Sequence, residues 1–245
     1  AGVRIAREAA GDRVYVVGSM GPCLAPGQGA PGQRQALTHA FAEQATLLAA
    51  AGVDALQLET FSRLDELLLA VQAAAGTGLP ILASFTCDAS GQTAVGTDAE
   101  VLARALEAEP AVTAIGLNCG VGPSGLFDAV QRVLAVVQKP ILASPNAGFP
   151  QQVQGRLIYV TTPEYFAEYA KRFVKLGVRG VGGCCGTTPE HVREAARALS
   201  GLSEVRQHVV AAAAPSRVPA AVAVATGVSV VGFGHLFEIY SSNFL

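Results

Sequence analysis

Gly182-Gly183-Cys184-Cys185-Gly186-Thr187-Thr188-Pro189 follows an apolar run, Val178 to Val181, and precedes a helix expected to begin at Pro189. Two adjacent thiols therefore stand at the carboxyl end of a predicted strand. Upstream, Gly116-Leu117-Asn118-Cys119-Gly120 ends another predicted strand with a third thiol. Zinc prefers thiolate ligands, and a catalytic zinc site has three protein ligands and an open fourth position. The three cysteines thus indicate an open metal site.

The rest of the chain alternates apolar runs with helical patterns. Strands are predicted to begin at Val14, Ala55, Ile81, Thr113, Ile141 and Val178. Their starts recur about every 33 residues, which is typical of βαβ units. The pattern predicts an α/β fold, and 245 residues is a suitable length for one (β/α)8 TIM-type barrel. Polar residues follow the strand ends, where such barrels carry their active sites; they are Glu59, Asp88, Cys119, Asn146, Cys184 and Cys185.

Composition excludes several classes of protein. A formal charge of -2 offers no basic face for nucleic acid. Five cysteines are an odd number in a chain too long for a disulfide scaffold, so we expect a reduced, cytoplasmic protein without a secretory signal. The stretch between Arg217 and Glu238 carries no charge, but its glycines and proline favour a tail over a membrane helix.

Each candidate residue also has a simpler interpretation. The three cysteines could be small buried hydrophobic residues, or Cys184 and Cys185 could form a vicinal disulfide. Glu59 could be a solvated loop carboxylate or a partner for Ser62, the expected N-cap of the next helix. Asp88 is better explained by turn formation before Gly91. His191 is expected to be exposed in the first turn of a helix.

Three motifs together resemble the zinc-dependent homocysteine S-methyltransferase family. They are Gly-Leu-Asn-Cys-Gly at 116–120, Ser-Pro-Asn-Ala-Gly at 144–148, and Gly-Gly-Cys-Cys-Gly-Thr-Thr-Pro-Glu-His at 182–191. The resemblance covers about residues 1–199 and looks closest to the methyltransferase module of bacterial proteins that fuse this barrel to a methylenetetrahydrofolate reductase. It implies transfer of a methyl group to the sulfur of homocysteine, which gives methionine.

The resemblance also implies roles for individual residues. Cys119, Cys184 and Cys185 match the zinc ligands of the family. Glu59 matches the glutamate that receives the homocysteine amino group, and Asn146 matches an asparagine at the pocket mouth. With Thr60 and Asn118 these two residues form the expected substrate-binding set. Cys23 and Cys87 match no ligand and are expected to be ordinary thiols.

The chain departs from the family pattern in one large respect. The family begins with a strand ending in Asp-Gly and a second ending near Asn-Thr-Phe, and neither is present in this sequence. We therefore expect a barrel, 1–199, that lacks its first two β/α units, followed by a tail or linker, 200–245. Segments 220–224 and 228–231 of the tail are candidate strands.

The missing units leave a second hypothesis, a catalytically inactive barrel fragment or zinc-binding module that needs the absent segment. Exposed sheet edges would favour a homo-oligomer. A third hypothesis is a barrel transferase with another thiol or selenol acceptor. The expected partners are homocysteine, a small methyl donor and a fused or separate reductase domain, without nucleic acid or membrane. The sequence does not select the donor.

Overall fold

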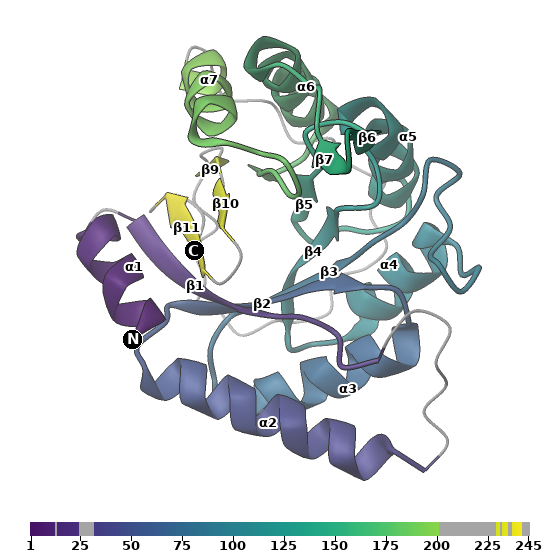
Figure 1. The fold of residues 1–245 in the computed structure, drawn as a ribbon. Coiled ribbons are helices and arrows are strands. Elements are labelled where there is room, and N and C mark those ends of the chain that lie inside the picture. The colour runs from purple at the N-terminus through teal and green to yellow at the C-terminus, as the bar shows by residue number, and fades with distance from the viewer. Residues whose placement is uncertain (13, 25–31, 201–228, 231, 235–236, 242–245) are drawn as a thin grey trace.

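The structure, a computed structural model, describes residues 1–12, 14–24, 32–200, 229–230, 232–234 and 237–241. Its main feature is a curved sheet with helices on the outer face (Figure 1). The helices are α1 (Gly2–Ala10), α2 (Arg34–Ala50), α3 (Leu64–Ala75), α4 (Ala99–Ala108), α5 (Pro123–Leu134), α6 (Pro163–Leu176) and α7 (Pro189–Ser200). The strands are β1 (Val14–Met20), β2 (Ala55–Phe61), β3 (Ile81–Phe85), β4 (Val112–Asn118), β5 (Ile141–Ser144), β6 (Gln151–Val153), β7 (Arg156–Ile158), β8 (Gly180–Val181), β9 (Ser229–Val230), β10 (Gly232–Gly234) and β11 (Phe237–Ser241).

Six parallel strands form the centre of this sheet in the order β1-β2-β3-β4-β5-β8, which confirms the predicted α/β architecture. Apolar side chains cover both faces. The larger cluster lies between the sheet and the helices, and a smaller one lines the inner face through Val17, Ala55, Leu82, Ala114 and Leu142. Burial on both faces explains why these strands appear in the sequence as continuous apolar runs.

Some local predictions were wrong. The glycines at 18 and 21 predict a turn over residues 18–22, but β1 continues through Gly18 and Ser19 to Met20. The N-cap of α3 is Arg63, without a side-chain cap bond, and not Ser62. A short antiparallel hairpin, β6–β7, was not predicted, because each of its strands has only three residues. Thr162 caps α6, since its hydroxyl accepts a hydrogen bond from the Tyr165 N–H.

Strands from residues 229–241 lie at both edges of the parallel sheet. β9 runs parallel to β8, and β11 runs antiparallel to β1, so the tail supplies strands that its sequence only partly indicated. β9 and β11 also approach each other. The fold is thus a part barrel, and the yellow strands of Figure 1 lie where its two edges converge. The candidate strand 220–224 lies outside the described residues, and the loss of two β/α units stays a prediction.

Within the described ranges, every helix is too short or too polar to cross a lipid bilayer.

Candidate metal centre

The structure brings the three sequence-predicted cysteines together. Cys119 follows β4, Cys184 and Cys185 follow β8, and their three sulfurs all lie within 4.8 Å of one another. The Cys119 and Cys185 sulfurs are 3.7 Å apart. Two sulfurs bound to one zinc at about 2.3 Å with tetrahedral angles would stand about 3.8 Å apart. The ligand chemistry of the three thiols and the spacing of the Cys119–Cys185 pair therefore fit zinc.

The cysteines are free thiols, which removes the vicinal disulfide as an interpretation. The three cluster cysteines are each partly exposed, so simple burial as small hydrophobic residues does not describe them either. Cys87, by contrast, is buried, and burial raises its pKa to about 12. At neutral pH the Cys87 thiol is therefore protonated, and the thiol is a much weaker nucleophile than the thiolate.

Two tight turns orient the cysteines. Cys119 has φ 62° and Gly120 has φ 75°, a left-handed corner directly after β4. A Cβ on Gly120 would lie 2.2 Å from the Cys87 carbonyl oxygen, so only glycine fits. Gly186, with φ 77°, follows the cysteine pair, and a Cβ there would lie 2.2 Å from the Tyr159 ring.

Hydrogen bonds among the thiols set their charge. The pKa of Cys119 is lowered to about 6, first because the Cys184 thiol donates to its sulfur, with weaker help from the Gly120 N–H and Cys185. The pKa of Cys184 is raised by the same hydrogen bond, by burial and by neighbouring negative charge. Burial and the charge on Cys119 raise the pKa of Cys185. Without a cation, the cluster therefore holds one thiolate near neutral pH.

Asn118, an expected substrate-binding residue, faces protein groups. It is 1% exposed. Its Oδ1 accepts from the Thr60 N–H at 2.9 Å, and its Nδ2 donates to Thr60 Oγ1 at 2.7 Å and to the Cys184 sulfur at 3.9 Å. Thr60 has φ 65°, a conformation that costs a β-branched residue about 1–3 kcal/mol. The Asn118 side chain therefore stabilises a strained corner at the end of β2.

Asn146 also lies against the cysteines. Its side chain is buried, and its Oδ1 accepts a hydrogen bond from the Cys185 N–H at 3.1 Å. The adjacent Ala147 N–H donates to the Cys185 carbonyl oxygen at 2.8 Å. The loop after β5 is thereby fixed to the cysteine pair.

Glu59 stands beside Thr60 on β2 and is half-buried. Its carboxylate accepts a hydrogen bond from the Ser19 hydroxyl near the end of β1. Ser19 was not selected from the sequence, because its glycine neighbours indicated a turn. Its position opposite Gln57 in the β1–β2 register is the structural reason that it reaches the carboxylate.

His191 was expected to be exposed, and that prediction was wrong. It is 6% exposed, with Nε2 donating to the Thr161 carbonyl oxygen at 2.8 Å and Nδ1 accepting from the Thr188 N–H at 3.2 Å. This tautomer is assigned from its partners. Packing of α6 against the start of α7 encloses the ring, which lies edge-on to Phe166. His191 ties the segment after β7 to the turn that carries the cysteine pair.

Tyr159 lies in that segment and contacts the cluster. The pKa of Tyr159 is raised, mainly by burial and to a smaller extent by the negative charge of Cys185 and a hydrogen bond to it. A neutral phenol at this point keeps an O–H available to a cysteine sulfur throughout the physiological pH range.

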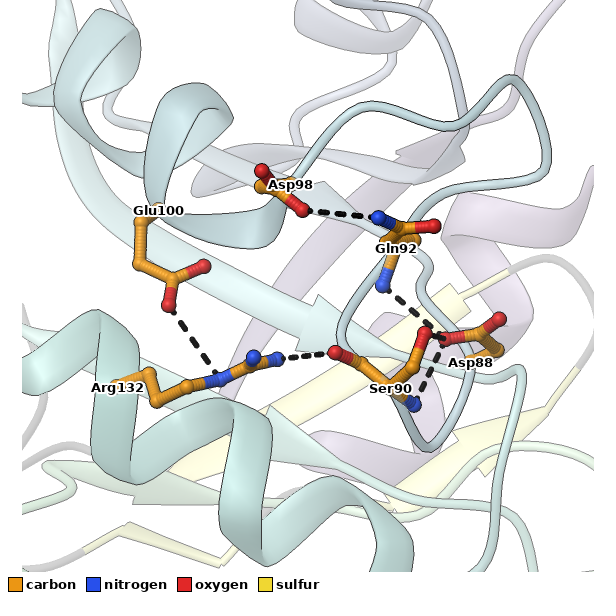
Figure 2. A network of polar contacts seen from close by, with 6 residues as sticks. All are labelled: Asp88, Ser90, Gln92, Asp98, Glu100 and Arg132. Carbon is orange, nitrogen blue, oxygen red and sulfur yellow. Dashed lines mark hydrogen bonds and ion pairs between the residues drawn. The ribbon is translucent and has the colours of Figure 1, made fainter.

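Asp88 forms a turn, as the simpler interpretation predicted. Its Oδ1 accepts hydrogen bonds from the Ser90 N–H, the Ser90 hydroxyl and the Gln92 N–H (Figure 2). The Ser90 hydroxyl is the largest cause of the lowered pKa of Asp88. Arg132 on α5 donates to the Ser90 carbonyl oxygen at 2.7 Å and pairs with Glu100. The loop after β3 is thus a self-contained structure held to α5.

A cleft of about 630 Å³ lies beside the cluster and not over it. Its walls come from the start of α5, the segments 148–149 and 160–162, Ala89 and Tyr165, and none of the cysteines lines it. The convergence of sulfurs, and not the cleft, therefore locates the chemistry.

Comparisons with known proteins agree with the geometry. The family model described as Homocysteine S-methyltransferase matches residues 1–199. The methionine synthase of Mycobacterium tuberculosis (strain ATCC 25618 / H37Rv) is 32% identical over 203 residues, which cover 80% of this chain and 17% of that protein. The methionine synthase of Mycobacterium leprae (strain TN) is 32% identical over 198 residues, which cover 78% and 16%. The chain thus spans less than a fifth of the length of these two relatives.

Solved structures show the same fold. The homocysteine methyltransferase MmuM from Escherichia coli, in its apo form, is 25% identical with a TM-score of 0.60 and covers 75% of this chain and 63% of that chain. Its metallated form is 23% identical with a TM-score of 0.57 and covers 80% and 65%.

Proposed function

Because the chain belongs to the homocysteine S-methyltransferase family, we propose that it transfers a methyl group to the sulfur of homocysteine and forms methionine. The observation that carries the proposal is the convergence of the Cys119, Cys184 and Cys185 sulfurs within 4.8 Å at the carboxyl ends of two strands. These three residues would hold zinc. Bound zinc would lower the pKa of the homocysteine thiol, so that its sulfur is available as a nucleophile at neutral pH.

The chain's own residues would hold the other end of the substrate. The Glu59 carboxylate, which accepts a hydrogen bond from the Ser19 hydroxyl, would receive the substrate ammonium group. A charge-assisted hydrogen bond of this kind contributes about 1.5–3 kcal/mol. Asn118 and Asn146 already use their side-chain oxygens on Thr60 and Cys185, so we assign them to positioning the site rather than to direct substrate contact.

The reaction balances without a redox step. The homocysteine sulfur forms a bond to the methyl carbon, the bond between that carbon and the donor breaks, and its electron pair leaves with the donor. The thiol proton passes to solvent. No observation favours an inactive fragment or a different thiol acceptor over this reaction. A fused or separate reductase domain and a homo-oligomer remain predictions from the sequence.

The test is a methylation assay with the full chain loaded with zinc. Homocysteine is incubated with S-methylmethionine, S-adenosylmethionine, betaine or a methyl-folate or methyl-cobalamin donor, and methionine is measured by mass spectrometry. Methionine with at least one donor, and its loss after zinc is removed by a chelator, is the expected result. Absence of product with every donor, from protein that contains one zinc per chain, would refute the proposal.

A further inference from the structure

Asn118 connects the Thr60 corner beside Glu59 to the cysteine pair. It lies at the end of β4, and the order β2-β3-β4-β5-β8 puts that strand midway between the strand of Glu59 and the strand of the cysteine pair. Its side chain reaches both sides, since it bonds Thr60 after Glu59 and the sulfur of Cys184. At 1% exposure, water does not compete for these bonds.

The Thr60 corner needs this support. A threonine at φ 65° is strained. Two hydrogen bonds to the Asn118 side chain hold it there: the Thr60 N–H donates at 2.9 Å, and the Thr60 hydroxyl accepts at 2.7 Å. Glu59 precedes this corner directly, so its direction depends on the conformation of Thr60. Loss of the amide would let the corner relax and would move the carboxylate.

We propose that Asn118 is a positioning residue that sets the distance between the two ends of the substrate pocket, and so selects a substrate of the length of homocysteine. The proposal rests on the proposed function, in which the amino group meets Glu59 and the sulfur meets the cysteine cluster. One rigid amide fixes both ends at once. A shorter amino thiol such as cysteine, with one methylene fewer, could then reach only one of them.

The test compares the wild type, Asn118→Leu, Thr60→Val and the double variant. Leucine keeps the branching and the number of side-chain heavy atoms of asparagine and removes all three hydrogen bonds. Valine keeps the shape of threonine and removes one. Ser84→Ala is the control, because Ser84 is buried in the same sheet and accepts a side-chain hydrogen bond from Gln57 at 2.6 Å. Zinc affinity is measured by chelator competition, and homocysteine and cysteine binding to the zinc-loaded protein by calorimetry.

The expected results separate the two contacts of Asn118. Asn118→Leu lowers zinc affinity about tenfold, as loss of an outer-shell partner does, and raises the homocysteine Kd about tenfold. Thr60→Val raises the homocysteine Kd and leaves zinc affinity within about twofold, because the Asn118 bond to Cys184 remains. The two changes are not additive in the double variant, since they remove one shared interaction. The preference for homocysteine over cysteine falls in both single variants.

Three outcomes would overturn the proposal: additive costs in the double variant, an Asn118→Leu protein that matches Ser84→Ala, or an unchanged preference for homocysteine over cysteine. If Asn118→Leu fails to fold, Thr60→Val alone must raise the homocysteine Kd. If the zinc-loaded wild type binds no homocysteine, the proposed function itself fails, and unchanged zinc affinity in Asn118→Leu would still refute the link to Cys184.

Discussion

Each sulfur of the cluster has a distinct electrostatic role. Cys119 carries the charge because its neighbours donate hydrogen bonds to it, whereas the pKa values of Cys184 and Cys185 are raised. The thiolate is the reactive form of cysteine towards alkylating agents. Reactivity in the metal-free protein should therefore differ sharply between cysteines.

We expect iodoacetamide to label Cys119 in the metal-free protein with half-maximal rate near pH 6, because its pKa is lowered to about 6. At lower pH the labelling rate decreases, because the thiolate is protonated. Exposed Cys23 is the internal control, and burial and the charge of Glu66 raise its pKa, so its labelling needs alkaline conditions. Peptide mass spectrometry across pH 5–10 gives both profiles, and a Cys119 midpoint above pH 8 would contradict the shared-charge arrangement.

Removal of one thiol should remove the metal. Cys185→Ala is expected to lower zinc affinity at least about a hundredfold, because two ligands remain where three are needed. Metal analysis after dialysis against a weak chelator measures this. Cys23→Ala, a cysteine outside the cluster, should keep one zinc per chain. Equal zinc content in both variants would show that the cluster is not the site.

Glu59 should contribute to substrate binding and not to metal binding. Glu59→Gln is expected to raise the KM for homocysteine about tenfold to a hundredfold, because a neutral amide loses the charge-assisted bond to the ammonium group. Zinc content should stay unchanged. Glu43→Gln on the exposed face of α2 is the matched control. Loss of zinc together with activity, or an unchanged KM, would be incompatible with the assigned role.

At the scale of elements, the turn after β8 places the cysteine pair. Gly186 adopts φ 77° directly after Cys185 and packs under the Tyr159 ring, while His191 secures the segment that carries the tyrosine. The conformation of this turn therefore determines where two of the three sulfurs lie.

Gly186→Ala should damage the metal site beyond its effect on stability. Gly78→Ala is a matched control, because Gly78 has φ 71° but a Cβ there meets nothing within 4 Å. In both variants the free energy of unfolding should fall by about 1 kcal/mol, because alanine is strained in the left-handed conformation. Only Gly186→Ala should also lower zinc affinity, about tenfold, because the Tyr159 ring must move. Chemical denaturation and chelator competition separate the two effects, and equal zinc affinities would argue against the packing role.

Much of the fold and the cysteine cluster could be predicted from the sequence, since apolar runs, Pro-initiated helices and strand-end thiols are local signals. The partners of Asn118 and the Ser19 contact to Glu59 could not, because they join strands far apart in the chain. The predicted exposure of His191 was wrong, because its position in a helix does not show that the Thr161 carbonyl oxygen lies against its ring. Three-residue strands such as β6 and β7 carry too little pattern to be recognised.

At the scale of the whole molecule, tail strands cover the two edges of the parallel sheet. β11 pairs with β1 over Val14–Gly18, and β9 pairs with β8. Uncovered edges of a sheet promote association of chains.

Truncation after Ser200 is therefore expected to convert the protein to larger species at equal concentration, as measured by sedimentation velocity. Zinc binding should persist in the truncated chain, because all three cysteines lie before residue 200. If the truncated chain sediments as a species of the same association state as the full chain, the tail strands do not protect the edges.

The single charge shared by the sulfurs has a consequence for how the protein acquires its metal. Three thiolates are required around zinc, but only Cys119 is deprotonated near neutrality, so uptake of one ion should expel about two protons into the medium. Metal occupancy is then coupled to acidity. A modest fall in pH would favour the empty protein steeply, and calorimetry in buffers of different ionisation enthalpy would count the protons directly.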